Sequence, residues 1–104
     1  KLLEDIQIKI ARDEFEFSKH AVDQSIVRNI RVREIREATA NRARVIEDYP
    51  DDKYGPSCLL LGFTSRNRPL HIQYSYPSRP LVKIVTVYEP EPELWIDFSI
   101  RKTD

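Results

Sequence analysis

The fold is decided by the stretch Tyr49-Pro50-Asp51-Asp52-Lys53-Tyr54-Gly55-Pro56-Ser57-Cys58-Leu59-Leu60-Leu61-Gly62, which leads from a polar turn directly into an apolar run. Proline, aspartate and glycine favour a turn in its first half. The run 57–64 is almost wholly apolar, which is typical of a central, buried strand. Strand patterns also cover 44–49, 70–76 and 81–88. Because short connections favour antiparallel neighbours, these segments predict a four-stranded antiparallel meander.

Helical patterns fill the residues that precede the first of these strands. Apolar residues recur at near i, i+4 spacing in 2–13, which predicts an amphipathic helix. Ser18 can cap a second helix over 19–29, and a third helix is expected over 32–41. The sequence therefore predicts an α+β fold in which N-terminal helices pack on the meander sheet.

Local residue choices add further expectations about these elements. Val22 and Ile26, together with Ala21 or Ser25, are expected on the buried stripe of the second helix. Asn29 is expected to end that helix, because asparagine tolerates the left-handed conformation. The alternation around 15–17 favours a short extended link. The segment 89–95 has proline and acidic residues at its start, which predicts a final turn of helix.

The composition bounds the class of protein. The 104 residues are the size of one domain, 1–104, and 40% of them are hydrophobic, enough for a single core. Seventeen Lys and Arg residues balance seventeen Asp and Glu residues, so the net charge gives no reason to expect nucleic-acid binding. The single cysteine, Cys58, excludes an internal disulfide and is expected to be a buried thiol. Without a signal-peptide pattern or an apolar run of about 20 residues, the chain is expected to be cytoplasmic, away from membranes.

Four residues form the candidate catalytic set. Metal-independent RNA cleavage needs a base, an acid and a cation beside the phosphate, roles that suit histidine and arginine. His20 and Arg28 lie about two turns apart on one face of the second helix, roughly 12 Å along its axis, so they can line a common groove. His71 lies on the polar face of its strand and Tyr88 ends the last strand. Whether His71 faces His20 depends on which sheet face the helices cover, and purely structural histidines are the alternative interpretation.

Arginines supply the candidate RNA contacts. Six of them fall within 28–44, and such local basicity can bind phosphates even on a neutral protein. The predicted RNA-binding residues are Arg31, Arg66, Arg68 and Arg79. The alternative interpretation is a solvated helix face with intrahelical ion pairs.

Several other chemistries are set aside on residue counts. Two histidines and one cysteine cannot form a usual structural zinc site, so no metal is expected. Two glycines exclude a glycine-rich phosphate loop, and no cofactor is expected. Cys58 lacks a local activating context and is not expected to be a nucleophile. Tyr74 is expected in the core, and Trp95 is expected to anchor the C-terminal segment.

Six short segments, taken together, resemble the DUF4258 family: Phe17-Ser18-Lys19-His20-Ala21, Arg28-Asn29-Ile30, Glu47-Asp48-Tyr49-Pro50, Ser57-Cys58-Leu59-Leu60-Leu61-Gly62, Pro69-Leu70-His71 and Tyr88-Glu89-Pro90. The resemblance covers roughly 15–98, and Asn29 stands where the family usually has glycine. It implies kinship with the RelE/ParE-type toxins, small α+β domains with helices packed on an antiparallel sheet. It also implies a ribonuclease toxin, acting on free RNA or on the ribosome, that an antitoxin protein holds inactive.

Two functions follow as hypotheses. The first is a toxin-type domain of a toxin–antitoxin system that acts on RNA as a metal-independent endoribonuclease. The second is a non-catalytic protein-interaction module, whose segregated charge and exposed sheet edge serve a protein partner. A homodimer formed by pairing of edge strands is a third alternative. Burial discriminates between the first two: a wide separation of His20 from His71, or an internally bonded histidine, favours the interaction module.

Overall fold

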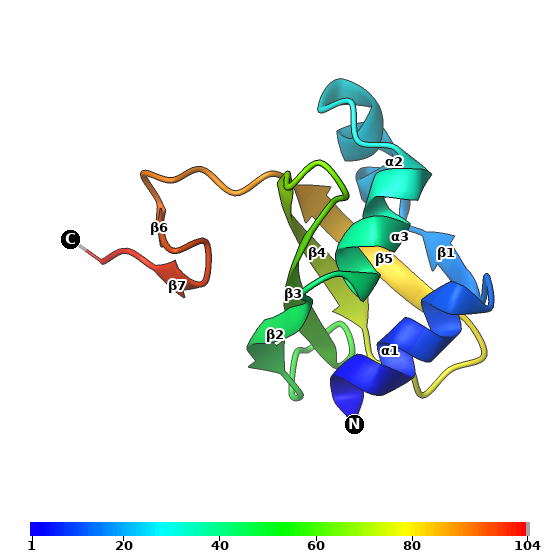
Figure 1. The fold of residues 1–104 in the computed structure, drawn as a ribbon. Coiled ribbons are helices and arrows are strands. Elements are labelled where there is room, and N and C mark those ends of the chain that lie inside the picture. Colours follow the sequence, from blue (N-terminus) through cyan, green and yellow to red (C-terminus); the bar gives the residue numbers. More distant parts are fainter. Residues whose placement is uncertain (104) are drawn as a thin grey trace.

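A sheet lies at the centre of the molecule, between three helices and a C-terminal hairpin, in the computed structural model, which describes residues 1–103 (Figure 1). Five strands form the main sheet in the order β1-β5-β4-β3-β2, and β6 and β7 pair separately. No helix in the described part of the chain has the length and apolar character needed to cross a membrane. In chain order the elements are α1 (Leu2–Ala11), β1 (Phe15–Phe17), α2 (Lys19–Val27), α3 (Val32–Ala40), β2 (Arg44–Tyr49), β3 (Ser57–Phe63), β4 (Pro69–Ser75), β5 (Val82–Tyr88), β6 (Trp95–Ile96) and β7 (Ile100–Arg101).

The predicted four-stranded antiparallel meander has to be corrected to a five-stranded mixed sheet. Strands β2 to β5 are antiparallel neighbours in chain order, but β1 adds to β5 in parallel. The residues expected to form an extended link are therefore a strand. Phe15 and Phe17 pack against the core from this strand, while Glu16 between them is exposed. Three residues are too few for a periodic pattern to distinguish a strand from a link.

The C-terminal segment also differs from the prediction. No helix forms over 89–95, but a single turn closed by a 2.9 Å hydrogen bond from the Leu94 N–H to the Glu91 carbonyl leads into the short hairpin of β6 and β7. Pro90 and Pro92 have no backbone N–H to donate, which weakens helix formation there. Trp95 is buried, as expected of an anchor. Because Trp95 lies against the main sheet, tertiary packing rather than local preference fixes this segment.

Helix α2 begins and ends for local reasons that the sequence predicted. The Ser18 hydroxyl accepts a hydrogen bond from the Ala21 N–H at 3.0 Å and donates to the carbonyl of Val85 at 2.9 Å, which ties the helix start to β5. Asn29 has φ of 54°, the left-handed conformation expected at the helix end. Ile30 then turns back into the core.

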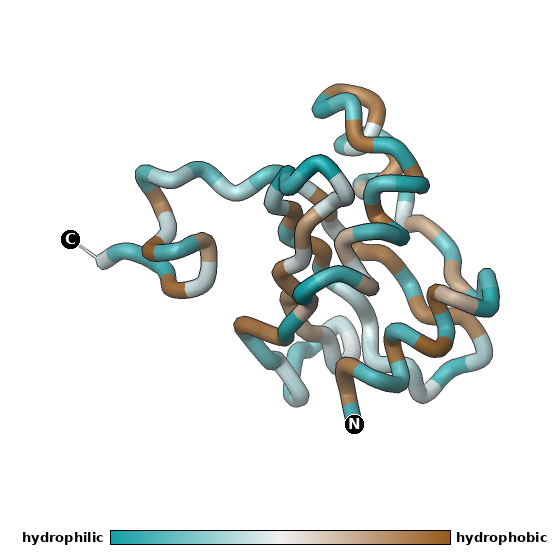
Figure 2. The backbone as a smooth tube through the Cα atoms, in the orientation of Figure 1, coloured by the Kyte–Doolittle hydropathy of each residue, from teal (hydrophilic) through white to brown (hydrophobic). Residues whose placement is uncertain are grey.

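The buried face of α2 agrees with the predicted one only at Ala21. Val22 and Ile26 point to solvent, with Ile26 73% exposed, and Ala21 is the buried residue of the helix. The Gln24 side-chain oxygen accepts a hydrogen bond from the backbone N–H of Val87 at 3.2 Å, on β5. A small residue and a polar one thus face the sheet, while an apolar stretch remains at the outer end of the helix, coloured brown at the top of Figure 2.

The core lies between the helices and one face of the sheet. An alanine-like Cβ at Gly62 would lie 1.7 Å from the carbonyl oxygen of Ala38, so α3 rests directly on β3. Tyr74 is fully buried, as expected, and its hydroxyl shares a 2.7 Å hydrogen bond with the hydroxyl of Thr39. Cys58 is also buried, and burial raises the pKa of its thiol to about 12, so the thiol is not a nucleophile at neutral pH.

Candidate functional site

We term the sheet face that turns away from the helices the outer face. Strand alternation places His71, Gln73 and Ser75 of β4 on it, as the sequence predicted, because Leu70, Ile72 and Tyr74 point into the core. The segment 90–103, termed the tail, lies over one half of this face. We call that half the covered half and the rest the open half. Each half contains a separate group of polar side chains.

His71 is the centre of the covered half. Its side chain has no solvent exposure, and both ring nitrogens are hydrogen-bonded within the fold. The Nε2 atom lies 2.6 Å from the carbonyl oxygen of Phe98, which can only accept, so Nε2 carries the proton. The Nδ1 atom therefore accepts from the Tyr88 hydroxyl at 3.1 Å. Trp95 meets the imidazole edge to face, with ring centroids 4.4 Å apart.

Burial lowers the pKa of His71, and this outweighs the Phe98 carbonyl and Glu47, which act in the opposite direction. The ring is therefore neutral at neutral pH. Burial likewise raises the pKa of the Tyr88 hydroxyl, while the positive charges of Arg101 and Arg28 oppose that rise. The pair thus forms a neutral, closed hydrogen-bond chain from Tyr88 through His71 to the tail backbone.

An ion pair fixes the tail beside this chain. The Arg101 guanidinium donates to both oxygens of Glu47, with Nε–Oε2 at 2.8 Å and Nη2–Oε1 at 3.1 Å. The Tyr49 hydroxyl donates to the same carboxylate. Burial acts to raise the pKa of Glu47, but hydrogen bonds from Arg101 and Tyr49 outweigh it and hold that pKa below its ordinary value. The guanidinium also lies over the Trp95 ring, 4.7 Å from its centroid.

The predicted catalytic residues are only partly brought together. His71 and Tyr88 are in contact, and the charge of Arg28 reaches the Tyr88 hydroxyl. His20 is exposed on α2, which packs on the helix-covered face of β5. The sheet therefore lies between His20 and His71.

Arg68 is a structural residue. Its guanidinium makes ion pairs with Glu34 at 3.0 Å and Glu89 at 2.7 Å, and it donates to the backbone carbonyls of Arg28 and Asn29, both at 3.1 Å. It therefore joins the end of α2, the start of α3 and the end of β5. Because two carboxylates neutralise its charge, this arginine is not free to hold a phosphate.

Of the other predicted RNA-binding arginines, Arg79 lies apart from Arg66. Arg31 is the residue before α3, and Arg66 lies in the turn between β3 and β4. Arg79 lies in the loop between β4 and β5. Successive turns of a meander fall at opposite ends of the sheet, so Arg66 and Arg79 are far apart. Of these three arginines, Arg79 is the one that lines a pocket described here.

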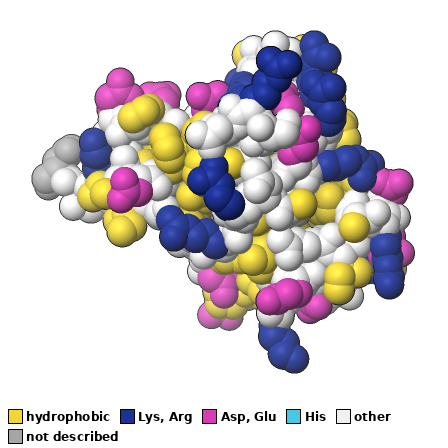
Figure 3. Space-filling view, viewed as in Figure 1, with side chains coloured by type: hydrophobic (Ala, Val, Ile, Leu, Met, Phe, Trp, Pro, Cys, Tyr) yellow, Lys and Arg dark blue, Asp and Glu magenta, His cyan; other side chains and the backbone are white. Residues whose placement is uncertain are grey.

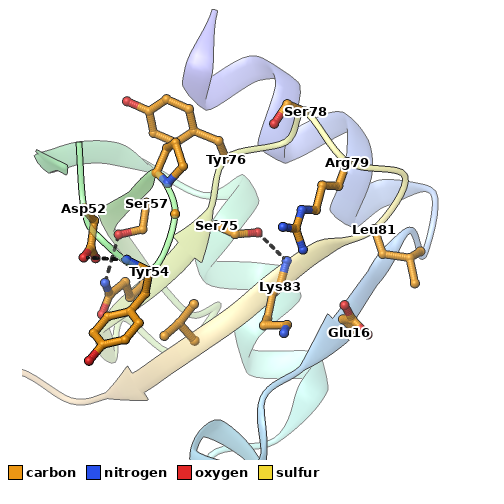
Figure 4. Close-up of a pocket in the computed structure, with 14 residues that line it drawn as sticks. Glu16, Asp52, Tyr54, Ser57, Ser75, Tyr76, Ser78, Arg79, Leu81 and Lys83 are labelled. Carbon is orange, nitrogen blue, oxygen red and sulfur yellow. Dashed lines mark hydrogen bonds between the residues drawn. The ribbon is translucent and has the colours of Figure 1, made fainter. Parts of the chain in front are cut away.

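The open half carries a groove with a volume of about 290 Å³ (Figure 4). Its floor is formed by Ser57, Gln73 and Ser75 of the neighbouring strands β3 and β4. The Gln73 amide donates to the Ser57 hydroxyl at 3.1 Å, which orients both side chains. The Ser75 hydroxyl accepts from the backbone N–H of Lys83 at 2.8 Å. Both hydroxyls keep an O–H that points to no acceptor within residues 1–103.

The two walls of the groove have opposite charge. Figure 4 shows Asp52 and Tyr54 on one side, and Arg79, Lys83 and Glu16 on the other. The Arg79 side chain extends from its loop toward the strand that carries Lys83. Neither cation makes an ion pair with any described residue. The groove can therefore accept an anionic group at one end and hydrogen-bond donors at the other.

Several of these residues were not singled out by the sequence. Glu47 and Arg101 belong to segments 54 positions apart, so no local spacing relates them. Asp52 and Lys83 become neighbours of one groove only through the order of the strands. The available signal was the strict alternation of 70–76, which marked a polar face without showing that the tail covers half of it.

Comparison with known families gives one match. A family described as "Domain of unknown function (DUF4258)" matches residues 17–89, well over half of the chain. The matched region runs from the end of β1 to just after β5, and the tail follows it. No curated protein and no solved structure matches the chain.

Proposed function

Given that the chain belongs to the DUF4258 family, whose description assigns no function, we propose that it is a non-catalytic protein-interaction module. The observation that carries this proposal is a surface at the end of α2, where apolar side chains stand exposed among arginines. We term it the basic corner. It consists of Val22, Ile26, Val27, Arg28, Arg31 and Arg33.

The basic corner has the composition of a docking surface. Ile26 is 73% exposed and Val27 is 83% exposed, although both are aliphatic. The three arginines are exposed and make no ion pair with any residue in 1–103. In Figure 3, Lys and Arg side chains, coloured dark blue, gather at the top of the molecule, over the end of α2. Exposed apolar groups rimmed by charge are typical of protein interfaces.

The chemistry of the corner favours a protein over RNA as its occupant. Aliphatic side chains gain about 25 cal/mol for each Å² that is removed from water, but they offer no aromatic face on which a base can stack. The arginines complement carboxylates. The partner that fits is an acidic, amphipathic segment of another protein, the kind of segment by which an antitoxin could hold this domain.

The positions of the two histidines support a non-catalytic role for the domain. An acid and a base that act on one phosphodiester must reach the same substrate, yet the sheet lies between His20 and His71. His71 has both nitrogens bonded to Tyr88 and Phe98. Without movement of the tail, neither nitrogen can take a proton from a substrate.

Co-expression tests the proposal. The domain is produced with the product of the neighbouring reading frame, and the affinity of the complex is compared for wild type, Ile26→Asp and Ile8→Asp. Ile8 is an exposed isoleucine on α1 and is the matched control. We expect Ile26→Asp to weaken the complex at least about tenfold and Ile8→Asp to leave it unchanged. Equal affinities for the two variants would contradict docking at the basic corner.

A second candidate function is RNA cleavage at the His71–Tyr88 pair, in keeping with the RelE/ParE-type kinship that the resemblance implies. The observation that favours it is the 3.1 Å contact between an imidazole and a phenol, and the positive charge of Arg28 acts to lower the pKa of that phenol. In this case the tail must move aside to admit RNA, His71 acts as base, Tyr88 as acid and Arg28 as phosphate clamp.

An assay with RNA, with and without ribosomes, distinguishes the two candidates. Cleavage that is lost in His71→Gln and Tyr88→Phe but kept in His20→Ala would establish the second candidate. Cleavage lost in His20→Ala would place the reaction at a different site. If the domain is a non-catalytic interaction module, neither the wild type nor any of these variants will cleave the RNA.

A further inference from the structure

We propose that the groove on the open half binds one nucleoside monophosphate, with its phosphate at Arg79 and Lys83 and its base between Tyr54 and Asp52. This site is separate from the basic corner, and the inference does not depend on the proposed function. The proposal rests on the charge of each wall, on the free hydroxyls of the floor and on the length of the groove.

The cationic wall suits a phosphate. The guanidinium of Arg79 is a planar fork that can donate two parallel hydrogen bonds to phosphate oxygens. Lys83 adds a second positive charge, partly offset by Glu16, its register neighbour on β1. Because the Ser75 hydroxyl accepts from the Lys83 backbone, its own O–H can be donated to the same phosphate. This end therefore supplies cations and a hydroxyl donor around one anion.

The opposite wall suits a nucleobase. The Tyr54 side chain is 86% exposed, and a base can stack on the ring face opposite Lys53, whose ammonium lies 5.1 Å from the ring centroid. The Oδ1 atom of Asp52 accepts from the backbone N–H of Tyr54 at 3.3 Å, and no described group donates to Oδ2. A carboxylate oxygen accepts from the N–H groups on the edge of a base. Guanine presents two such donors side by side, so a guanine nucleotide is the best fit.

The dimensions agree with a ligand of this size. The floor from Ser57 across Ser75 to Lys83 spans two strand spacings, about 10 Å. The volume of about 290 Å³ lies at the lower end of the range for small-molecule sites. Inorganic phosphate would fill only the cationic end and leave the Oδ2 atom of Asp52 without a donor. A ligand with an anion at one end and N–H donors at the other fills both.

Calorimetric titration with GMP tests the site, with ribose 5-phosphate and inorganic phosphate as partial ligands. We expect GMP to bind at least about tenfold more tightly than ribose 5-phosphate. Arg79→Gln should weaken GMP binding about tenfold or more, whereas Arg66→Gln, at the other end of the sheet, should not change it. Asp52→Asn should weaken GMP binding several-fold and leave ribose 5-phosphate binding unchanged.

Any one of three results would overturn the proposal. One is the absence of saturable GMP binding to the folded protein at millimolar concentration. Another is equal GMP affinity for Arg79→Gln and Arg66→Gln, and the last is ribose 5-phosphate or inorganic phosphate binding as tightly as GMP. Arg79 is exposed, so loss of binding in its variant can be separated from unfolding by a thermal scan. If a 5′-phosphorylated tetranucleotide binds more tightly than GMP, the ligand is the end of an RNA. If the tetranucleotide and GMP bind with equal affinity, the ligand is a free nucleotide.

Discussion

The covered and open halves of the outer face are built from the same strands. The polar groups of the covered half are bonded to other residues of the fold, whereas the cations of the open half have no ion-pair partner among the described residues. In the covered half His71 has no exposure and Glu47 is held by Arg101 and Tyr49. In the open half Arg79 and Lys83 have no ion pair with any residue that the structure describes. A polar strand residue is therefore structural or available for binding according to what lies over it. Here the tail, more than the sheet, decides which.

The largest expected effect comes from removing the side chain that closes the covered half. Trp95→Ala should lower the free energy of unfolding by about 3 kcal/mol, because it empties a buried space against the His71 ring. The measurement is the denaturation midpoint in guanidinium chloride. The control in the open half is Leu81→Ala, which removes an exposed side chain from the groove wall and should cost under about 0.5 kcal/mol. Similar costs for the two variants would erase the distinction between the halves.

A pH-dependent effect of the buried histidine should come next. Burial lowers the folded-state pKa of His71, whereas the unfolded chain titrates near 6.5. Below about pH 6.5 the unfolded chain therefore binds more protons than the folded one. Stability is fully present above that pH and is lost as the pH falls through the folded-state pKa. The Tm of wild type should fall between pH 7 and pH 5, and that of His71→Gln should fall much less.

The matched control for the pH effect is His20→Gln, because His20 is exposed on α2. This variant should keep the wild-type pH dependence of Tm. If His20→Gln flattened the curve while His71→Gln did not, the neutral, closed state assigned to the covered half would be wrong.

A smaller effect is expected from the ion pair between β2 and the tail. Glu47→Gln keeps the shape of the side chain but removes the charge that holds Arg101, and should cost about 1–2 kcal/mol. Because Glu47 is 18% exposed and Arg101 60% exposed, the cost should fall at high salt but should not vanish. The test is urea denaturation at two salt concentrations. A cost that vanishes at high salt would show that this pair behaves as a surface pair.

The smallest effect should be found in the open half. Arg79→Gln should change the free energy of unfolding by less than about 0.5 kcal/mol, because Arg79 is exposed and unpaired by any described carboxylate. Thermal denaturation without ligand is the measurement. A large loss of stability would mean that Arg79 supports the fold, and the contrast between the halves would then be weaker than the geometry indicates.

Much of the fold followed from local patterns. Alternation located β4, the apolar run located β3, and Ser18 and Asn29 marked the two ends of α2. What failed depended on tertiary packing. The buried face of α2 was predicted only in part, because the helix approaches β5 through Ala21, which leaves Ile26 outside. Strand β1 was missed because its pairing with β5 joins segments more than sixty residues apart.

The site could be predicted only in part. The polar face of β4 placed His71 on a strand surface, and Tyr88 proved to be its neighbour through the register of β4 and β5. The tail over His71 was not predictable, because Trp95 and Arg101 reach the sheet through side-chain contacts with no fixed sequence spacing. The groove likewise depends on strand order, which local patterns do not specify.

The manner of attachment of the tail has a consequence for its motion. The β6–β7 hairpin pairs only with itself, and side chains such as Trp95 and Arg101 join it to the main sheet within the described residues. An element that shares no backbone ladder with its support can detach as a unit while the rest stays folded. Amide protons of 94–102 should then exchange with deuterium through a local opening, well before those of β3 to β5, which wait for global unfolding.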